Sequence, residues 1–83
     1  MKVKTITLEG QTKYTATISR DEKGIICQIN DNDGNCVNIH HVSIDDKDDQ
    51  FSLAECIQFQ LDGCRGTNSM KHDYMRLITL FAD

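Results

Sequence analysis

The chain has 83 residues, of which 39% are hydrophobic and 27% charged, and its net charge is −4. This length supports one small domain with a single core, and the composition is typical of a globular protein rather than a disordered one. There is no run of about 18 apolar residues to span a membrane and no charged-then-apolar leader, so we expect a cytoplasmic protein without a membrane partner.

The first half of the chain has the period-two alternation of β-strands. The pattern is clearest at residues 13–19, where Tyr14, Ala16 and Ile18 fall on one face and hydroxyl side chains fall on the other. The alternation and the intervening turn residues also place strands at residues 3–8, 25–30 and 36–44. Short connections between successive strands favour an antiparallel four-stranded β-meander.

Two turns define this meander. The stretch Asp21-Glu22-Lys23-Gly24 predicts a tight hairpin connection, in which Gly24 is able to take a positive φ. Asp33-Gly34 suits a two-residue type I′ turn. In that register, residues whose numbers sum to 67 face each other. Cys27 then opposes His40, and Cys36 opposes Asp31.

The second half of the chain changes to a helical period. Ser52 is the predicted N-cap of a first helix, and Glu55, three residues later, completes a capping box. Gly63 is the predicted C-terminal stop of this helix. Its apolar face would carry Leu53, Cys56, Ile57 and Leu61.

The last segment, residues 70–82, predicts a second helix. Five apolar or aromatic residues recur there at helical spacing, and Asn68 or Ser69 would cap the helix. The alternative is a fifth strand over residues 75–81. The predicted fold class is therefore α+β, a four-stranded antiparallel meander followed by two helices. Its core would include Tyr14, Ile18, Ile25, Ile29, Leu53, Ile57, Leu61, Tyr74, Leu77, Ile78 and Phe81.

Four cysteines and three histidines raise the question of metal or thiol chemistry. The separations between Cys27 and Cys36 and between Cys56 and Cys64 do not match the close pairs of structural zinc sites. Two alternatives stay open: a Cys27/His40 zinc site completed by helix thiols, and a thiol–base pair formed by Cys27 with His40 or Cys56 with His72. We favour reduced thiols that pack as ordinary half-buried side chains, with no metal, no cofactor and no enzymatic activity.

The stretch from Asp31 to Gly34 also has the Asp-x-Asp-Gly pattern of a calcium-binding loop. An EF-hand loop in this register would need a carboxylate at position 29 and a closing Glu at position 40. Ile29 and His40 occupy these places. The hairpin interpretation is therefore preferred.

Negative charge is concentrated in the middle of the chain. Residues 31–62 hold eight carboxylates and one cation, Lys47, for a balance of −7, whereas residues 1–30 and 63–83 carry +2 and +1. A field of one sign selects partners of the other sign. The run at residues 45–49 also has a plain explanation, a solvated loop before a helix N-terminus. We predict that a basic surface of a host protein or nucleoprotein complex is bound by Asp31, Asp33, Asp45, Asp46, Asp48 and Asp49.

In size, acidic charge and lack of catalytic signatures, the chain is similar to the small single-domain proteins by which phages and mobile elements inhibit host machinery, such as the anti-CRISPR proteins. The resemblance implies an inhibitor that occupies a surface of a nucleic-acid-processing or CRISPR-type complex. It rests on the format of the chain alone and implies no site residues.

The alternative function is a nucleic-acid-binding module, although the net negative charge disfavours it. A basic sheet face with an aromatic residue binds single strands in some proteins. This face would be built on the N-terminal hairpin from Lys2, Lys4, Lys13, Tyr14, Arg20 and Lys23.

Overall fold

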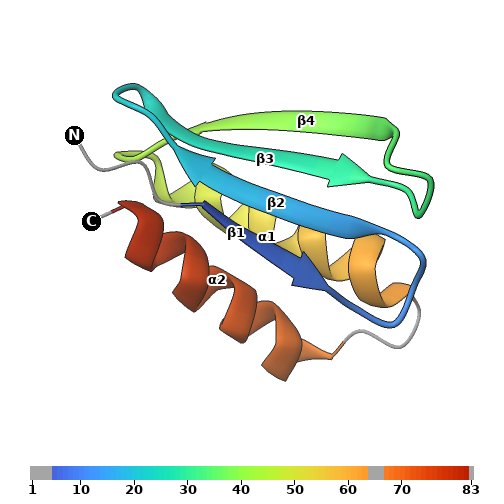
Figure 1. The fold of residues 1–83 in the computed structure, drawn as a ribbon. Helices are drawn as coiled ribbons and strands as arrows, with labels where there is room; N and C mark the ends of the chain where they lie inside the picture. Colours follow the sequence, from blue (N-terminus) through green and yellow to red (C-terminus); the bar gives the residue numbers. More distant parts are fainter. Residues whose placement is uncertain (1–4, 64–66, 83) are drawn as a thin grey trace.

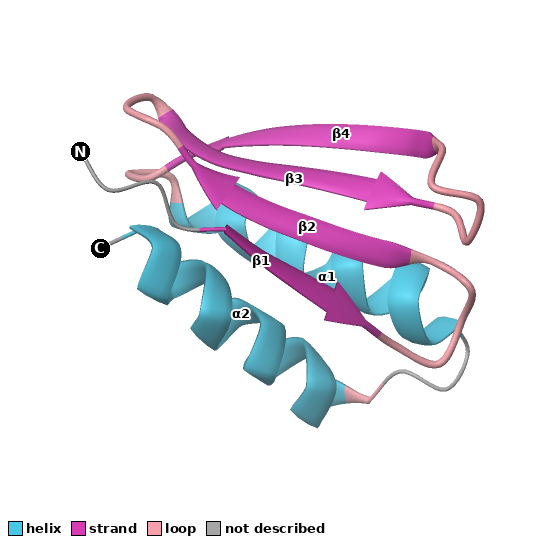
Figure 2. Cartoon of the chain, in the orientation of Figure 1, coloured by secondary structure: helices cyan, strands magenta, loops and turns pink. Residues whose placement is uncertain are grey.

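The computed structural model describes residues 5–63 and 67–82. Its elements in chain order are β1 (Thr5–Glu9), β2 (Thr15–Arg20), β3 (Gly24–Asn30), β4 (Cys36–Ser43), α1 (Lys47–Asp62) and α2 (Asn68–Ala82). The strands form one antiparallel sheet in sequential order, and both helices lie on the same face of it (Figures 1 and 2). The predicted α+β meander with two helices is confirmed, and the last segment is a helix rather than a fifth strand.

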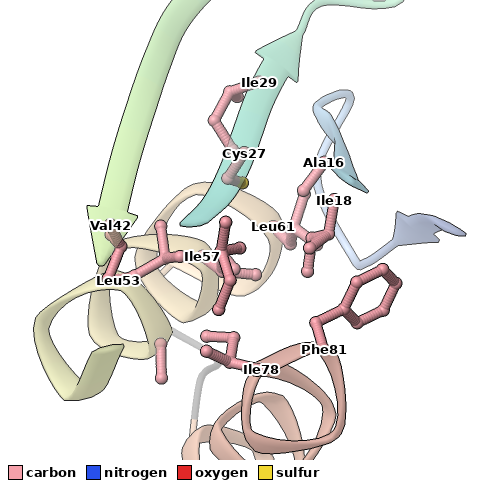
Figure 3. Packing of buried hydrophobic residues seen from close by; sticks show 12 residues of the cluster. Ala16, Ile18, Cys27, Ile29, Val42, Leu53, Ile57, Leu61, Ile78 and Phe81 are labelled. Atoms are coloured by element: carbon pink, nitrogen blue, oxygen red, sulfur yellow. The ribbon is translucent and has the colours of Figure 1, made fainter. Parts of the chain in front are cut away.

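The core lies between the sheet and the two helices. Figure 3 shows Ile18 and Cys27 on the strands facing Ile57 on α1 and Ile78 on α2, and all four side chains are buried. Eight of the eleven predicted core residues are buried. The other three, Tyr14, Tyr74 and Leu77, are half-buried. The predicted core did not include Cys27, Val42 and Ala54, which are buried, and Ala16 is buried on the strand face where the alternation placed it.

The β3–β4 connection differs from the predicted type I′ turn. Cys27 does pair with His40, but the register shifts after Ile29, and Cys36 pairs with Asn30 rather than Asp31. The Gly34 N–H donates to the Asp31 carbonyl at 3.1 Å. Gly34 has a φ of 85°, and no residue other than glycine has a positive φ in the described part of the chain. A type I′ turn needs positive φ at both central residues, which an aspartate adopts less readily than glycine. The chain therefore makes a longer turn with one left-handed residue and a bulge.

The β2–β3 connection is the predicted tight hairpin, but Gly24 has no positive φ. Its N–H and that of Lys23 donate to the Asp21 carboxylate at 2.9 and 2.8 Å, and these two bonds lower the pKa of Asp21. Glycine is required for space instead, because a Cβ at position 24 would lie 2.3 Å from the Val42 carbonyl oxygen.

The start of α1 is the main correction to the predicted fold. The helix begins at Lys47, and Asp46 is its N-cap, accepting the Asp49 N–H at 3.0 Å. Ser52 lies within the helix and is exposed, so the predicted capping box is wrong. Asp caps a helix as well as Ser does, and the acidic residues after it favour the positive end of the helix dipole. The helix therefore starts at the earlier of the two available caps and ends, as predicted, at Gly63.

The second helix is also capped by a residue other than the predicted ones. The Thr67 hydroxyl accepts the Met70 N–H at 3.2 Å, which places the N-cap before Asn68 and Ser69. Two side-chain bonds tie this helix to the rest of the fold. The Tyr74 hydroxyl donates to the buried Asp62 carboxylate at 2.6 Å, and Arg20 donates to the Phe81 carbonyl at 2.7 Å.

Candidate functional site: the β4 edge

The structure divides the predicted acidic surface into two clusters. The first, Asp31 and Asp33, lies in the β3–β4 turn, and the second, residues 45–49, lies between the end of β4 and the first turn of α1. These two connections are at opposite ends of the sheet in Figure 1. The eight residues of β4 lie between them, and the seven steps from Cys36 to Ser43, at roughly 3.4 Å each, span about 24 Å. This separation exceeds the screening length of about 10 Å at 0.1 M salt, so the clusters act as two local fields.

Two of the predicted acidic residues accept hydrogen bonds from the backbone of their own chain. The Asp31 carboxylate accepts the N–H groups of Asp33 and Asn35 at 3.0 and 2.9 Å, which shapes the turn. Asp46 caps α1. The other four predicted side chains are exposed and accept no hydrogen bond from residues 5–63 and 67–82: Asp33, Asp45, Asp48 and Asp49. These four carboxylates are the part of the predicted site that is free to meet a partner.

A buried glutamine fixes the second cluster relative to β4. The Gln50 side chain is fully buried, and its amide nitrogen donates to the carbonyls of Ser43 and Ile44 at 3.1 and 2.9 Å. These bonds hold the first turn of α1 against the end of the strand. The carboxylates at 45, 48 and 49 therefore sit at a defined place beside β4 rather than on a loose loop.

The strand between the two clusters is an open edge. β4 pairs with β3 on one side, and no described strand pairs with its other side. Six of its eight residues are exposed, and Val37 and Ile39 keep 49% and 51% of their surface. Edge strands usually carry charges, prolines or covering elements that block pairing. The residues of β4 itself include none of the charged blocking side chains, apart from two histidines, and no proline.

One hydrogen bond shows which backbone groups face the open side. The Ile39 N–H donates to the side-chain oxygen of Asn38 at 2.9 Å, and so points away from β3. In an antiparallel pair, successive residues alternate between facing the neighbouring strand and facing away from it. The His41 N–H therefore also faces the open side.

A groove of about 330 Å³ runs between β4 and α1. Its lining includes Ile39 and His40 from the strand and Ser52 and Cys56 from the helix. The His40 Nε2 is buried and has no hydrogen-bond partner. Cys56 also lines an adjoining hollow with Phe59, which keeps 69% of its surface exposed. Apolar and polar groups thus line the helix side of the β4 edge.

Within the described residues, the cysteines are not arranged as the alternative metal or thiol sites require. Cys27 is fully buried, and burial, followed by the charge of Cys56, raises its pKa from 9.0 to about 12, the opposite of what a thiolate nucleophile needs. Among the residues that the structure describes, no three His, Cys, Asp or Glu side chains could hold a metal ion. Cys36 is exposed, Cys56 is half-buried, and the prediction for Cys64 falls outside the described residues.

The basic hairpin does not gather its charges on one face within the described residues. Lys13 lies over the Tyr14 ring at 5.7 Å in the β1–β2 loop, while Lys23 is in the turn at the other end of β2. Arg20 is bonded to the end of α2. Lys2 and Lys4 lie outside the described residues. The alternating face of β2 that points away from the helices carries Thr and Ser instead.

Searches of family models, curated proteins and solved structures found no match to this chain. In the part of the chain that the structure describes, neither helix has the length and apolar character needed to cross a membrane. The inferences below therefore depend on the geometry of β4 and its surroundings.

Proposed function

We propose that this protein is a non-enzymatic binding protein, an inhibitor or adaptor that docks an acidic surface on a basic patch of a protein partner. The observation that supports the proposal is the exposed trio Asp45, Asp48 and Asp49, which Gln50 holds beside an open strand edge. Exposed like charges on a fixed element repel one another, and a basic surface relieves that repulsion. The small size, acidic charge and lack of catalytic signatures that the chain shares with small phage inhibitors favour a partner in a nucleic-acid-processing complex.

The trio also suits rapid encounter. Complementary charge mainly accelerates association, while apolar contacts formed after encounter slow dissociation. Ile39 lies on β4, which precedes this cluster, and Phe59 lies on α1, which begins within it; both side chains are exposed and offer such contacts. We expect charge to set the association rate of the complex and the β4–α1 surface to set its lifetime.

Charge neutralisation with a matched control tests this function. The test variant changes Asp45, Asp48 and Asp49 to Asn and leaves the capping residue Asp46 intact. The control variant changes Glu9 and Glu22 to Gln and Asp73 to Asn, so it removes the same charge from exposed positions elsewhere. Partners captured by the wild type from the native host are identified by mass spectrometry, and their association rates are measured at 50 and 300 mM salt.

We expect the test variant to associate roughly tenfold or more slowly at low salt, with a flatter salt dependence, while the control variant behaves like the wild type. Equal association by both variants would overturn the acidic-surface proposal. Oligonucleotide binding that is lost when Lys13 and Lys23 are changed to Ala would instead favour the nucleic-acid alternative.

A further inference from the structure

We propose that β4 binds an extended segment of the partner as a fifth strand of the sheet, and that this segment carries Lys or Arg at both of its ends. This inference rests on the proposed function, because it names the part of the partner that the acidic surface would hold. Strand addition supplies affinity through main-chain hydrogen bonds, and it selects side chains through alternating pockets.

The first support is that the outer side of β4 is exposed and unpaired within the described residues. β4 spans eight residues, six of them exposed, and the structure places no described strand on its outer side. The N–H of Ile39 faces that side and is held by the neighbouring Asn38 side chain, a contact that an incoming carbonyl can replace. The edge therefore offers main-chain donors of known position.

The second support is charge at both ends of this edge. Asp33 in the β3–β4 turn lies beyond one end of β4. At the other end, Asp45 follows the strand, and Asp48 and Asp49 lie in the first turn of α1, where Asp49 lines the groove beside β4. A strand that covers the whole of β4 would bring its own two ends to these clusters. Opposite charge at both ends of the incoming segment gives attraction at each cluster, about 24 Å apart.

The same charges disfavour a second copy of this chain as the occupant. Antiparallel pairing of two β4 strands would place the turn cluster of each copy beside the α1 cluster of the other. Like charges would then face each other at both ends of the shared edge. The acidic clusters protect the edge from self-association, a role usually taken by charges within an edge strand.

The groove between β4 and α1 determines which side chains of this segment would fit on the helix side of the sheet. Alternate residues of an added strand point to the helix side of the sheet, over Ser52, Cys56 and the exposed ring of Phe59. Asp49 and Glu55 also line these hollows, so the lining is mixed and suits small branched side chains such as Val and Thr. The opposite face of the segment would meet solvent beside Val37 and Ile39.

Two synthetic peptides test strand addition. The first has two lysines, three Thr-Val repeats and two further lysines. The second is the same peptide with its central valine changed to proline, which keeps the charge but prevents a continuous strand. Binding is measured by fluorescence anisotropy at 50 mM salt. We expect the first peptide to bind at least tenfold more tightly than the second.

Two variants at one position separate backbone pairing from side-chain contact. Ile39→Pro removes the outward N–H without removing a bond to β3, and Ile39→Thr removes the apolar side chain but keeps the N–H. We expect Ile39→Pro to bind the first peptide at least tenfold more weakly, and Ile39→Thr to stay within threefold of the wild type. Amide hydrogen exchange at His41 in the wild-type protein gives a measurement that needs no variant. Exchange there should slow at least tenfold when the first peptide is bound.

The outcomes distinguish this inference from the proposed function. Equal binding of both peptides, weakened by neutralising Asp45, Asp48 and Asp49, would overturn strand addition and leave the acidic-surface function standing. Unchanged exchange at His41, equal losses in the two Ile39 variants, or no binding of the first peptide would also overturn it. So would a wild-type dimer that Ile39→Pro dissociates, measured by sedimentation, because the edge would then serve a second copy.

Discussion

β3 and β4 are neighbours in one sheet, yet their environments are opposite. Every inward-facing residue of β3 is buried, whereas six of the eight residues of β4 are exposed. The inward positions explain the difference: β3 places Ile25, Cys27 and Ile29 there, and the facing positions of β4 are Val42, His40 and Asn38. Burying an inner face that is two-thirds polar would require a hydrogen-bond partner for each polar group, so these residues suit a strand at the edge. β3 thus supplies stability, and β4 is left available for a partner.

The largest expected effect follows directly from this comparison. Ile29→Ala in β3 removes a fully buried side chain from the core, and we expect it to lower the free energy of unfolding by about 2–4 kcal/mol. Ile39→Ala in β4 removes a side chain that is 51% exposed, and we expect a loss below about 1 kcal/mol. Urea unfolding of both variants measures the difference. Similar losses would mean that β4 contributes to the core as β3 does.

Thiol reactivity compares the same two strands without changing the fold. Cys36 begins β4 and is exposed, while Cys27 is at the centre of β3 and fully buried. At pH 8 we expect Cys27 to react with iodoacetamide at least roughly a hundredfold more slowly than Cys36, because reaction requires local opening. Peptide mapping by mass spectrometry follows each site. Equal rates in the native protein, with normal rates for both in urea, would contradict the buried position of Cys27.

The pKa of Cys27 adds a pH dependence to this experiment. Its folded pKa, about 12, is above the unfolded value of 9.0, so the folded state holds this proton more tightly. The resulting stabilisation is present below pH 9 and is lost as pH rises toward 12. The native labelling rate of Cys27 should therefore rise more steeply above pH 9 than that of Cys36. A Cys27→Ala variant, examined by thermal unfolding, should lose the part of the alkaline destabilisation that this thiol causes.

The sequence predicted the elements and their order because these depend on local periodicity. The alternation around Ile18 and the helical spacing around Ile57 each match a face that the fold buries. The predicted pairing of Cys27 with His40 is confirmed, although the turn from which it was predicted is not the one observed. Beside the turn, Asn30 pairs with Cys36, and a bulge after Ile29 that no local pattern specifies restores the predicted register along the rest of the hairpin.

The candidate site was less predictable because it depends on which strand lies at the edge. The acidic residues are evident in the sequence, but their division into two clusters follows from the position of β4 between them. Alternation at Val37 and Ile39 predicts a strand whether that strand is central or at an edge. The polar residues Asn38 and His40 on the inner face were the available signal, since a central strand rarely places two polar groups there.

The smallest expected effect concerns the end of β4 where α1 begins. Two residues are chemically suited to cap the helix, and the structure uses Asp46 and leaves Ser52 exposed in the helix interior. Asp46→Ala should lower the free energy of unfolding by about 1 kcal/mol, the usual loss on removing a cap. Ser52→Ala should cost nothing measurable or stabilise slightly, because Ala is the better residue inside a helix.

The same pair of variants shows how far the cap supports the acidic cluster beside it. Losing the cap frays the first turn, which includes Asp48 and Asp49, while the bonds from Gln50 to Ser43 and Ile44 retain the rest of α1. Amide exchange in Asp46→Ala should therefore speed up at residues 48 and 49 and stay unchanged at Ile57. If Ser52→Ala instead destabilised the protein and Asp46→Ala did not, the helix would begin at Ser52. The acidic run would then be a solvated loop, and its carboxylates would have no fixed place beside the strand.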